Sequence, residues 1–277
     1  MRVILCALLL VASQAFAAQA PLRFSIADSW AMPLVQIEDN QPRQGILYDM
    51  MSRLAQHLGR TAEFHVLARA RVQSAIEHGE IDVRCYSAQS WVDSPSGNYL
   101  WSIPLFIQRD LLVGNPKHTA PVDPRQLPTQ SIGTVLSYTY PTLQPLFDSG
   151  QLQRDDARSQ EQVLEKLTIE RSHYGVSNQW SLEWFNQRQA PERRLHAVAV
   201  LQEQGVGCYV RNDPSLPVQS ILRTLLRMKM SGEIDDIVRR YIGHYDDGPP
   251  DALPPLQPTA QPDHAIPGAD DSPPPSR

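Results

Sequence analysis

Short runs of polar, aromatic and basic side chains carry most of the groups in this sequence that could do chemistry. The runs are Asp28-Ser29-Trp30, the pair Arg69 and Arg71, Tyr86-Ser87, and Ser137-Tyr138-Thr139. Hydroxyl and carboxyl groups form hydrogen bonds, guanidinium groups bind carboxylates with paired hydrogen bonds, and aromatic rings stack on planar or cationic groups. These residue types favour binding of a small polar molecule that has an anionic or a ring portion.

The motifs of common enzyme chemistries do not occur. The sequence has no Gly-x-Ser-x-Gly, no His-Glu-x-x-His, no phosphate-binding loop and no dinucleotide-binding glycine motif. Its 8 His and 3 Cys show no metal-ligand spacing, so we predict no metal and no cofactor. Enzyme activity would need a general acid or base, for which Asp28 and then His173 are the candidates. We therefore predict a protein that is not an enzyme.

Each polar run follows a segment with the pattern of a β-strand. The predicted strands are 22–26, 63–67, 81–85, 111–114, 131–135, 173–177, 195–201 and 205–210. The predicted amphipathic helices are 47–58, 72–78, 160–169, 218–226 and 234–242. Alternating strands and helices indicate an α/β fold with a largely parallel sheet. Ligands bind beyond the carboxyl ends of strands in such sheets, which is where the polar runs lie.

The two ends of the chain have other compositions. Residues 1–17 combine Arg2, an apolar run and the small-x-small sequence Ala15-Phe16-Ala17, which is typical of a cleaved secretory signal. A membrane anchor is the alternative, but the apolar run is shorter than a membrane span requires. Residues 244–277 are rich in proline and aspartate and predict a disordered tail, either a plain solvated tail or a docking segment. The formal charge of −5 argues against nucleic-acid binding.

Removal of the predicted signal leaves two cysteines, Cys85 and Cys208. In an oxidising compartment an even pair is a candidate disulfide, and two buried free thiols are the alternative. Each cysteine belongs to a predicted strand.

Four further motifs occur in order along the chain. They are Gly45-Ile46-Leu47-Tyr48-Asp49, Gly79-Glu80-Ile81-Asp82, Trp101-Ser102-Ile103-Pro104-Leu105, and the segment from Tyr209 to Leu216 with its following helix. Together they resemble the family 3 extracellular solute-binding proteins, the periplasmic amino-acid-binding type. The likeness extends over about Leu22 to Gly243.

The resemblance implies a two-lobe α/β fold, the Venus-flytrap fold of periplasmic binding proteins, with two hinge crossings and a solute bound between the lobes. Lobe one would comprise residues 21–107 plus 206–243, and lobe two residues 108–205. In that topology the third strand of lobe one lies beside the returning strand. The resemblance thus implies a disulfide between Cys85 and Cys208.

The sequence departs from the family at two positions that usually hold charged anchors. The family binds the ligand carboxylate with an Arg shortly after the third strand, and Ser94 stands roughly there. It pairs the ligand ammonium group with an acid in lobe two, and Asn178 takes that place. The usual mode of α-amino-acid binding is therefore not expected.

The sequence thus predicts a monomeric, periplasmic solute-binding protein of an ABC importer, with a small polar solute as its ligand. We expect the site to be lined by Asp28, Trp30, Arg69, Arg71, Tyr86, Ser87, Ser137, Tyr138, Thr139 and Asn178. Several of these also have a purely structural alternative: a turn or helix cap at Asp28, a core contact at Trp30, a helix start at Ser137–Thr139 and solvated charges at the two arginines. A sensor for a membrane partner and, less favoured, a periplasmic dehydratase are the alternative functions.

Overall fold

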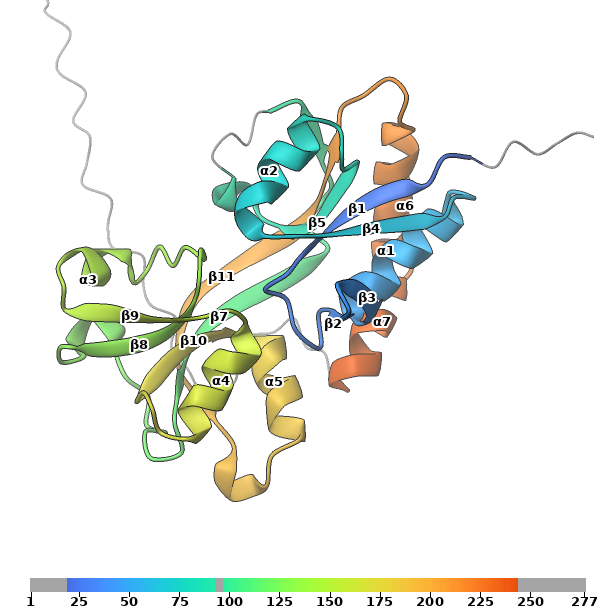
Figure 1. The fold of residues 1–277 in the computed structure, drawn as a ribbon. Coiled ribbons are helices and arrows are strands. Elements are labelled where there is room, and N and C mark those ends of the chain that lie inside the picture. Colours follow the sequence, from blue (N-terminus) through green and yellow to red (C-terminus); the bar gives the residue numbers. More distant parts are fainter. Residues whose placement is uncertain (1–18, 93–96, 244–277) are drawn as a thin grey trace, which may run out of the picture.

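The computed structural model describes residues 19–92 and 97–243 (Figure 1). The predicted signal segment 1–17, the predicted tail 244–277 and Ser94 lie outside the described residues. The ribbon falls into two lobes, joined by the long neighbouring strands β7 (Phe106–Gly114) and β11 (His196–Arg211). Nine strands form one continuous sheet across both lobes, because β11 pairs with β5 at one end and with β7 at the other.

Lobe one is a sheet with helices on both faces. Its strands are β1 (Leu22–Ala27), β4 (Ala62–Leu67), β5 (Val83–Ser87), β6 (Tyr99–Trp101) and the end of β11. Its helices are α1 (Ile46–His57), α2 (Arg69–Glu77), α6 (Val218–Met230) and α7 (Glu233–Ile242). A small hairpin of β2 (Gln36–Glu38) and β3 (Gln41–Gln44) precedes α1. Strands β4, β1 and β5 are parallel, so their carboxyl ends meet at one edge.

Alternating side chains divide the interior of lobe one into two apolar clusters. Cys208 and Val210 of β11 pack into the large cluster that includes α1, α6 and α7. Tyr209, between them, packs into a smaller cluster with residues of α2. This alternation follows from the two-residue period of a strand and gives a helix–sheet–helix arrangement.

Lobe two has the same layered arrangement. Besides β7 and β11 its strands are β8 (Gln130–Val135), β9 (Leu152–Ala157) and β10 (Tyr174–Asn178). Its helices are α3 (Gln144–Asp148), α4 (Gln160–Thr168) and α5 (Gln179–Gln187). Leu112 packs on one face of the sheet, and its neighbours Leu111 and Val113 pack on the other. The two-lobe α/β fold agrees with the sequence prediction, while the predicted lobe boundaries stay a prediction.

The two strands that were expected at 195–201 and 205–210 are one strand, β11. Gly205 lies within this strand and does not end it. The strand passes close to Pro104 at this position. A Cβ atom at Gly205 would lie 2.9 Å from the Cβ of Pro104. Glycine at this position therefore allows two segments to approach closely without ending the strand.

A disulfide joins Cys85 of β5 to Cys208 of β11 in the buried centre of lobe one. The two residues face each other in the antiparallel register of these strands. The pairing that the family resemblance implied is therefore present. The alternative of two free thiols is not what the structure shows.

Candidate functional site

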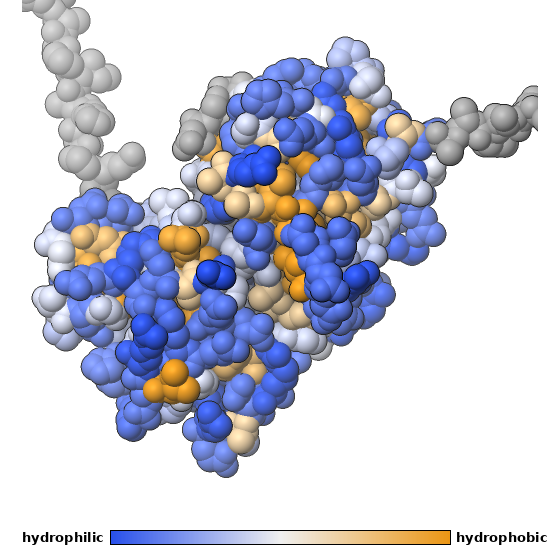
Figure 2. All heavy atoms as spheres, viewed as in Figure 1, coloured by the Kyte–Doolittle hydropathy of each residue, from blue (hydrophilic) through white to orange (hydrophobic). Residues whose placement is uncertain are grey.

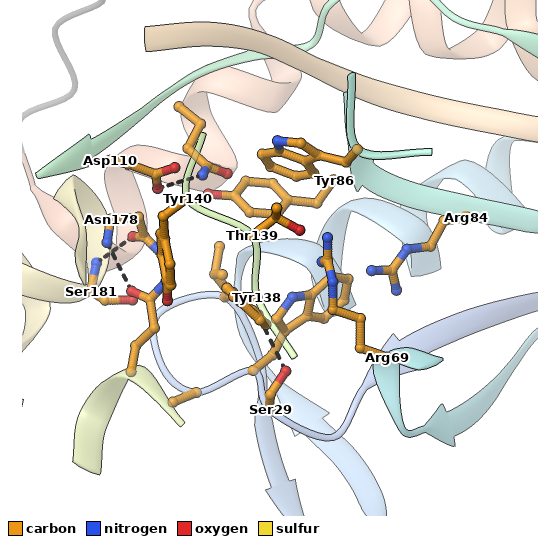
Figure 3. A pocket seen from close by; sticks show the side chains of 16 residues that line it. Ser29, Arg69, Arg84, Tyr86, Asp110, Tyr138, Thr139, Tyr140, Asn178 and Ser181 are labelled. Atoms are coloured by element: carbon orange, nitrogen blue, oxygen red, sulfur yellow. Dashed lines mark hydrogen bonds between the residues drawn. The ribbon is translucent and has the colours of Figure 1, made fainter. Parts of the chain in front are cut away.

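Two adjoining pockets lie between the lobes. The inner pocket is lined by side chains of both lobes (Figure 3). The outer pocket shares Arg69, Arg84, Trp91 and Thr139 with it. Hydrophilic residues cover most of the molecular face in Figure 2, and hydrophobic residues show between the lobes. We call the two pockets together the interlobe cleft.

The cleft is lined mainly from the carboxyl ends of strands. Trp30 follows β1, Arg69 follows β4, and Tyr86 stands near the end of β5. In lobe two, Tyr138 follows β8 and Asn178 ends β10. Parallel strands bring these ends together, which is why residues far apart in the sequence meet here.

Eight of the ten predicted site residues line the interlobe cleft. The inner pocket is lined by Trp30, Arg69, Tyr86, Tyr138, Thr139 and Asn178. The outer pocket adds Ser87 and Ser137. That these residues bind a ligand remains a prediction.

Asp28 and Arg71 line neither pocket. Asp28 is exposed in the turn after β1, where its amide donates a hydrogen bond to the Leu67 carbonyl at 3.0 Å. Arg71 is exposed and lies two residues beyond Arg69 in α2. Two residues correspond to about 200° around a helix, so the two arginines leave α2 on opposite sides. Only Arg69 reaches the cleft.

The segment after β8 is not the start of a helix, contrary to one sequence interpretation. Residues 136–137 and 141–143 form turns, residues 138–140 are irregular, and α3 begins only at Gln144. Ser137 has a φ of 63°, which a right-handed helix cannot accommodate. The backbone amides here do not form a helix N-terminus for an anion.

Asn178 has a structural role as well as a place in the inner pocket. It caps helix α5, with its Oδ1 accepting a hydrogen bond from the Ser181 amide at 2.8 Å. The backbone amide of Asn178 donates a hydrogen bond to Oε1 of Gln160 at 2.8 Å. The side-chain oxygen is thus already engaged within the protein.

Arg84 is a cleft residue that sequence reasoning missed. It lies on β5 and faces away from the Cys85 side of the sheet, toward Tyr209 and the cleft. Its guanidinium group stacks 4.6 Å from the Trp30 ring centroid, and its side chain is buried. A charged residue between two apolar residues of a buried strand was the signal that could have found it.

A bulge in β5 orients the next cleft residue, Tyr86. The register with β11 shifts between Gly207 and Cys208, so that these two neighbours lie opposite Ser87 and Cys85, with Tyr86 between them in β5. Its φ is 57°, a left-handed conformation that is costly for a tyrosine. Bulges redirect side chains next to functional sites, and the residue at this bulge, Tyr86, lines the inner pocket.

Asp110 on β7 is the second charged residue that the sequence reasoning missed. It pairs with Asn178 across β7 and β10 and lines the inner pocket. Burial raises the pKa of Asp110 to about 6, against the opposing effects of a hydrogen bond from Gln108 and the charge of Arg69. At neutral pH the carboxylate is therefore mostly ionised and has no ion-pair partner among the described residues.

Aromatic rings surround the charged groups of the cleft. Arg69 stacks 4.8 Å from the ring centroid of Tyr138 and 5.9 Å from that of Trp91. Trp30 meets Tyr86 edge to face, with ring centroids 6.1 Å apart. These contacts fix the cationic side chains against ring faces, and a contact with a ring face occupies none of the hydrogen-bond donors at the guanidinium edge.

The two candidates for acid–base catalysis do not meet in the cleft. Asp28 lies outside both pockets, and His173 stacks on His118 with ring centroids 4.3 Å apart. Within the part of the chain that the structure describes, no group of three His, Cys, Asp or Glu could hold a metal ion. The arrangement can bind and orient a polar molecule by charge, hydrogen bonding and ring contacts.

Solved structures share this fold at low sequence identity. The P235GK mutant of ArgBP from T. maritima has a TM-score of 0.65 and 16% identity, over 82% of this chain and 96% of that chain. The GluR0 ligand-binding core in complex with L-glutamate has a TM-score of 0.67 and 14% identity, over 82% and 100%. The B. pertussis BvgS periplasmic domain has a TM-score of 0.62 and 18% identity, over 80% and 42%.

No curated protein sequence matches the chain. A family model does match, and it covers residues 22–244, which include both lobes. It describes bacterial extracellular solute-binding proteins, which are binding proteins and not enzymes. The match agrees with the four motifs, the two-lobe fold and the prediction that the chain is not an enzyme. The chain belongs to the bacterial extracellular solute-binding proteins of family 3.

Proposed function

We propose that this protein binds a small polar solute, amino-acid-like or anionic, in the interlobe cleft and delivers it to an ABC permease from the periplasm. The observation that carries the proposal is the set of charged side chains in the cleft. Arg69, Arg84 and Asp110 line the inner pocket, and none of them forms an ion pair with a described residue. Such side chains are available to a charged solute.

Both lobes contribute to the same pocket, which fits capture by closure of the lobes. A solute held by Arg69 and Arg84 from lobe one and by Asp110 from the connecting strand would stabilise the closed arrangement. Solved neighbours of the fold include an ancestral arginine-binding protein bound to arginine and a GluR0 ligand-binding core in complex with L-glutamate. They support an amino-acid-like solute.

The extracellular location is that of the family, and we place this chain in the periplasm as a monomer. No helix among the described residues is long and apolar enough to cross a membrane. The alternative partner is a membrane sensor, which would respond to closure of the lobes without taking up the solute.

The proposal is tested in two steps. Calorimetric titration of the secreted protein with amino acids, organic acids, sugars and polyamines should find one class that binds. Uptake of the radiolabelled hit should then fall in cells that lack the protein and recover when it is restored. Binding without any effect on uptake would favour the sensor over the importer, and binding of no class would contradict the solute-binding function.

A further inference from the structure

Two guanidinium groups share the wall between the inner and outer pockets. Arg69 and Arg84 line both of them, and none of the described residues that line the outer pocket is acidic. The two positive charges are close enough that Arg69 contributes to the lowered pKa of Arg84. This part of the cleft is therefore strongly electropositive.

Arg84 is a buried cation without a counter-charge from the described chain. Its side chain is 4% exposed, and its hydrogen-bond partner is the Ser25 hydroxyl at 3.4 Å. Burial is the main reason that the pKa of Arg84 falls to about 10, which still leaves it protonated at neutral pH. An isolated buried charge is unfavourable, so this site fits an anion supplied from outside the chain.

The opposite side of the inner pocket accepts hydrogen bonds. Figure 3 shows Asp110 and Asn178 on one side of the pocket, and Arg69 and Arg84 on the other. Gln108 donates to Asp110 at 2.8 Å, while its own buried Oε1 has no hydrogen-bond partner among the described residues. A carboxylate and a free carbonyl oxygen together suit a cationic donor such as an ammonium group.

We propose that the solute carries two anionic groups and one ammonium group, as an acidic amino acid does. This inference rests on the solute-binding function proposed above. The anionic groups bind Arg69 and Arg84, and the ammonium group binds Asp110 and the Gln108 oxygen. The cleft contributes two positive charges and one negative charge, so a solute of net charge −1 neutralises it and pairs each charge with its opposite.

Other classes of solute leave a charge in the cleft without a partner. A neutral amino acid has one carboxylate for two guanidinium groups, and a basic amino acid adds a further positive charge beside them. A simple dicarboxylate brings no donor to Asp110 and places negative charge near it. Each of these losses leaves a buried polar group unsatisfied, which is how a site discriminates between similar molecules.

Calorimetric titration of the wild-type protein with three matched pairs of ligands tests the solute class. L-Glutamate and L-aspartate should bind at least about tenfold more tightly than L-glutamine and L-asparagine, because the amides lack the second anionic group. They should also bind more tightly than glutarate and succinate, which lack the ammonium group. A neutral or basic amino acid that binds as tightly as the acidic ones would overturn the inference and leave solute binding intact. Failure of every solute in the wider panel would overturn both.

Variants test which residue binds which charged group of the solute. Arg84→Gln should remove most of the preference for glutamate over glutamine, and Arg69→Gln serves the same purpose if the first variant does not fold. Asp110→Asn should remove the preference for glutamate over glutarate. Arg71→Gln is the matched control, since Arg71 leaves the same helix away from the cleft. Thermal unfolding of each variant verifies that it folds, and unchanged preferences in folded variants would contradict the assignment.

Discussion

The hydroxyl oxygens of Ser29 and Tyr138 lie 3.2 Å apart and form a hydrogen bond across the interlobe cleft. Ser29 belongs to the loop after β1 in lobe one, and Tyr138 to the loop after β8 in lobe two. The ring of the same tyrosine also stacks on Arg69 of lobe one. Tyr138 therefore holds the two lobes together by two separate contacts, and one of them fixes an arginine of the proposed site.

Two substitutions of Tyr138 separate these contacts. Tyr138→Phe removes the hydrogen bond and keeps the ring on Arg69, so the affinity for the solute should fall by about 0.5–1.5 kcal/mol. Tyr138→Ala also removes the stacking and should cost more. Calorimetry with the best ligand measures both, and equal affinities for wild type and Tyr138→Ala would show that Tyr138 has no part in closure.

The disulfide should make a measurable contribution to stability. Cys85 and Cys208 are 123 residues apart, and a cross-link over a loop of this length stabilises by about 4–5 kcal/mol in the chain-entropy model, often less in practice. The double variant Cys85→Ala/Cys208→Ala should lower the free energy of unfolding by about 2–5 kcal/mol. Denaturant unfolding measures this loss, and intact mass before and after reduction confirms the bond. Two thiols that alkylate freely in the native protein would contradict it.

Asp82 should make stability fall in acid. Its buried carboxylate contacts Arg23 at 2.6 Å and Arg211 at 3.0 Å. Burial alone would raise the pKa of Asp82, but the hydrogen bonds from the two arginines outweigh burial and lower it. Because the folded pKa lies below the unfolded value of about 3.9, this stabilisation is complete above that pH. It is lost as the pH falls through the folded pKa.

The matching variant is Asp82→Asn. It leaves two arginines around a buried site without their carboxylate, and should lower the free energy of unfolding at pH 7 by about 3–5 kcal/mol. It should also flatten the acid limb of the pH profile. Glu161→Gln breaks an ion pair with Arg188 in which both side chains are exposed, and should change stability by less than about 1 kcal/mol. Similar losses of unfolding free energy in the two variants would show that the buried Asp82 cluster stabilises the fold no more than an exposed ion pair does.

Solute affinity should depend on the protonation of Asp110. Burial raises the pKa of this carboxyl group to about 6 in the free protein, and the bound ammonium group requires it to be ionised. Affinity should therefore be level above about pH 7 and decrease as the pH falls below 6. Titrations between pH 5 and 8 with glutamate measure this, with Asp110→Asn as the reference. The variant should bind more weakly throughout and show a flatter profile.

The sequence predicted the residues that stand after strands better than those within them. Trp30, Arg69 and Tyr138 follow apolar runs, so strand pattern and the rule for open α/β sheets sufficed to place them near one another. Arg84 and Asp110 lie inside strands, where alternation and burial decide which way a side chain points. The bulge at Tyr86 depends on the pairing with β11, and such long-range register is not visible in a local pattern.

Two elements of lobe two, β9 and α5, were not predicted because their local composition does not show the usual pattern. Strand β9 has the sequence Leu-Gln-Arg-Asp-Asp-Ala and lies at the edge of the sheet, so it carries polar residues that do not resemble a strand. Helix α5 contains Trp180, whose ring packs against that of Phe106 with ring centroids 5.3 Å apart. Trp180 also belongs to the large apolar cluster of lobe one. A helix that contacts both lobes has no simple one-sided apolar pattern.

A thermal-shift titration of wild type, Arg69→Ala and Arg71→Ala with L-glutamate tests the central claim most directly. Solute at 100 times its dissociation constant stabilises the folded state by about 2.7 kcal/mol, which is several degrees for a protein of this size. Loss of a charged hydrogen bond at Arg69 should reduce affinity by about 1.5–3 kcal/mol, while Arg71→Ala should behave as wild type. A clear shift that Arg69→Ala alone weakens is the predicted result. A wild-type protein that shows no shift, or an Arg69→Ala variant that shifts as much as wild type, would contradict the account.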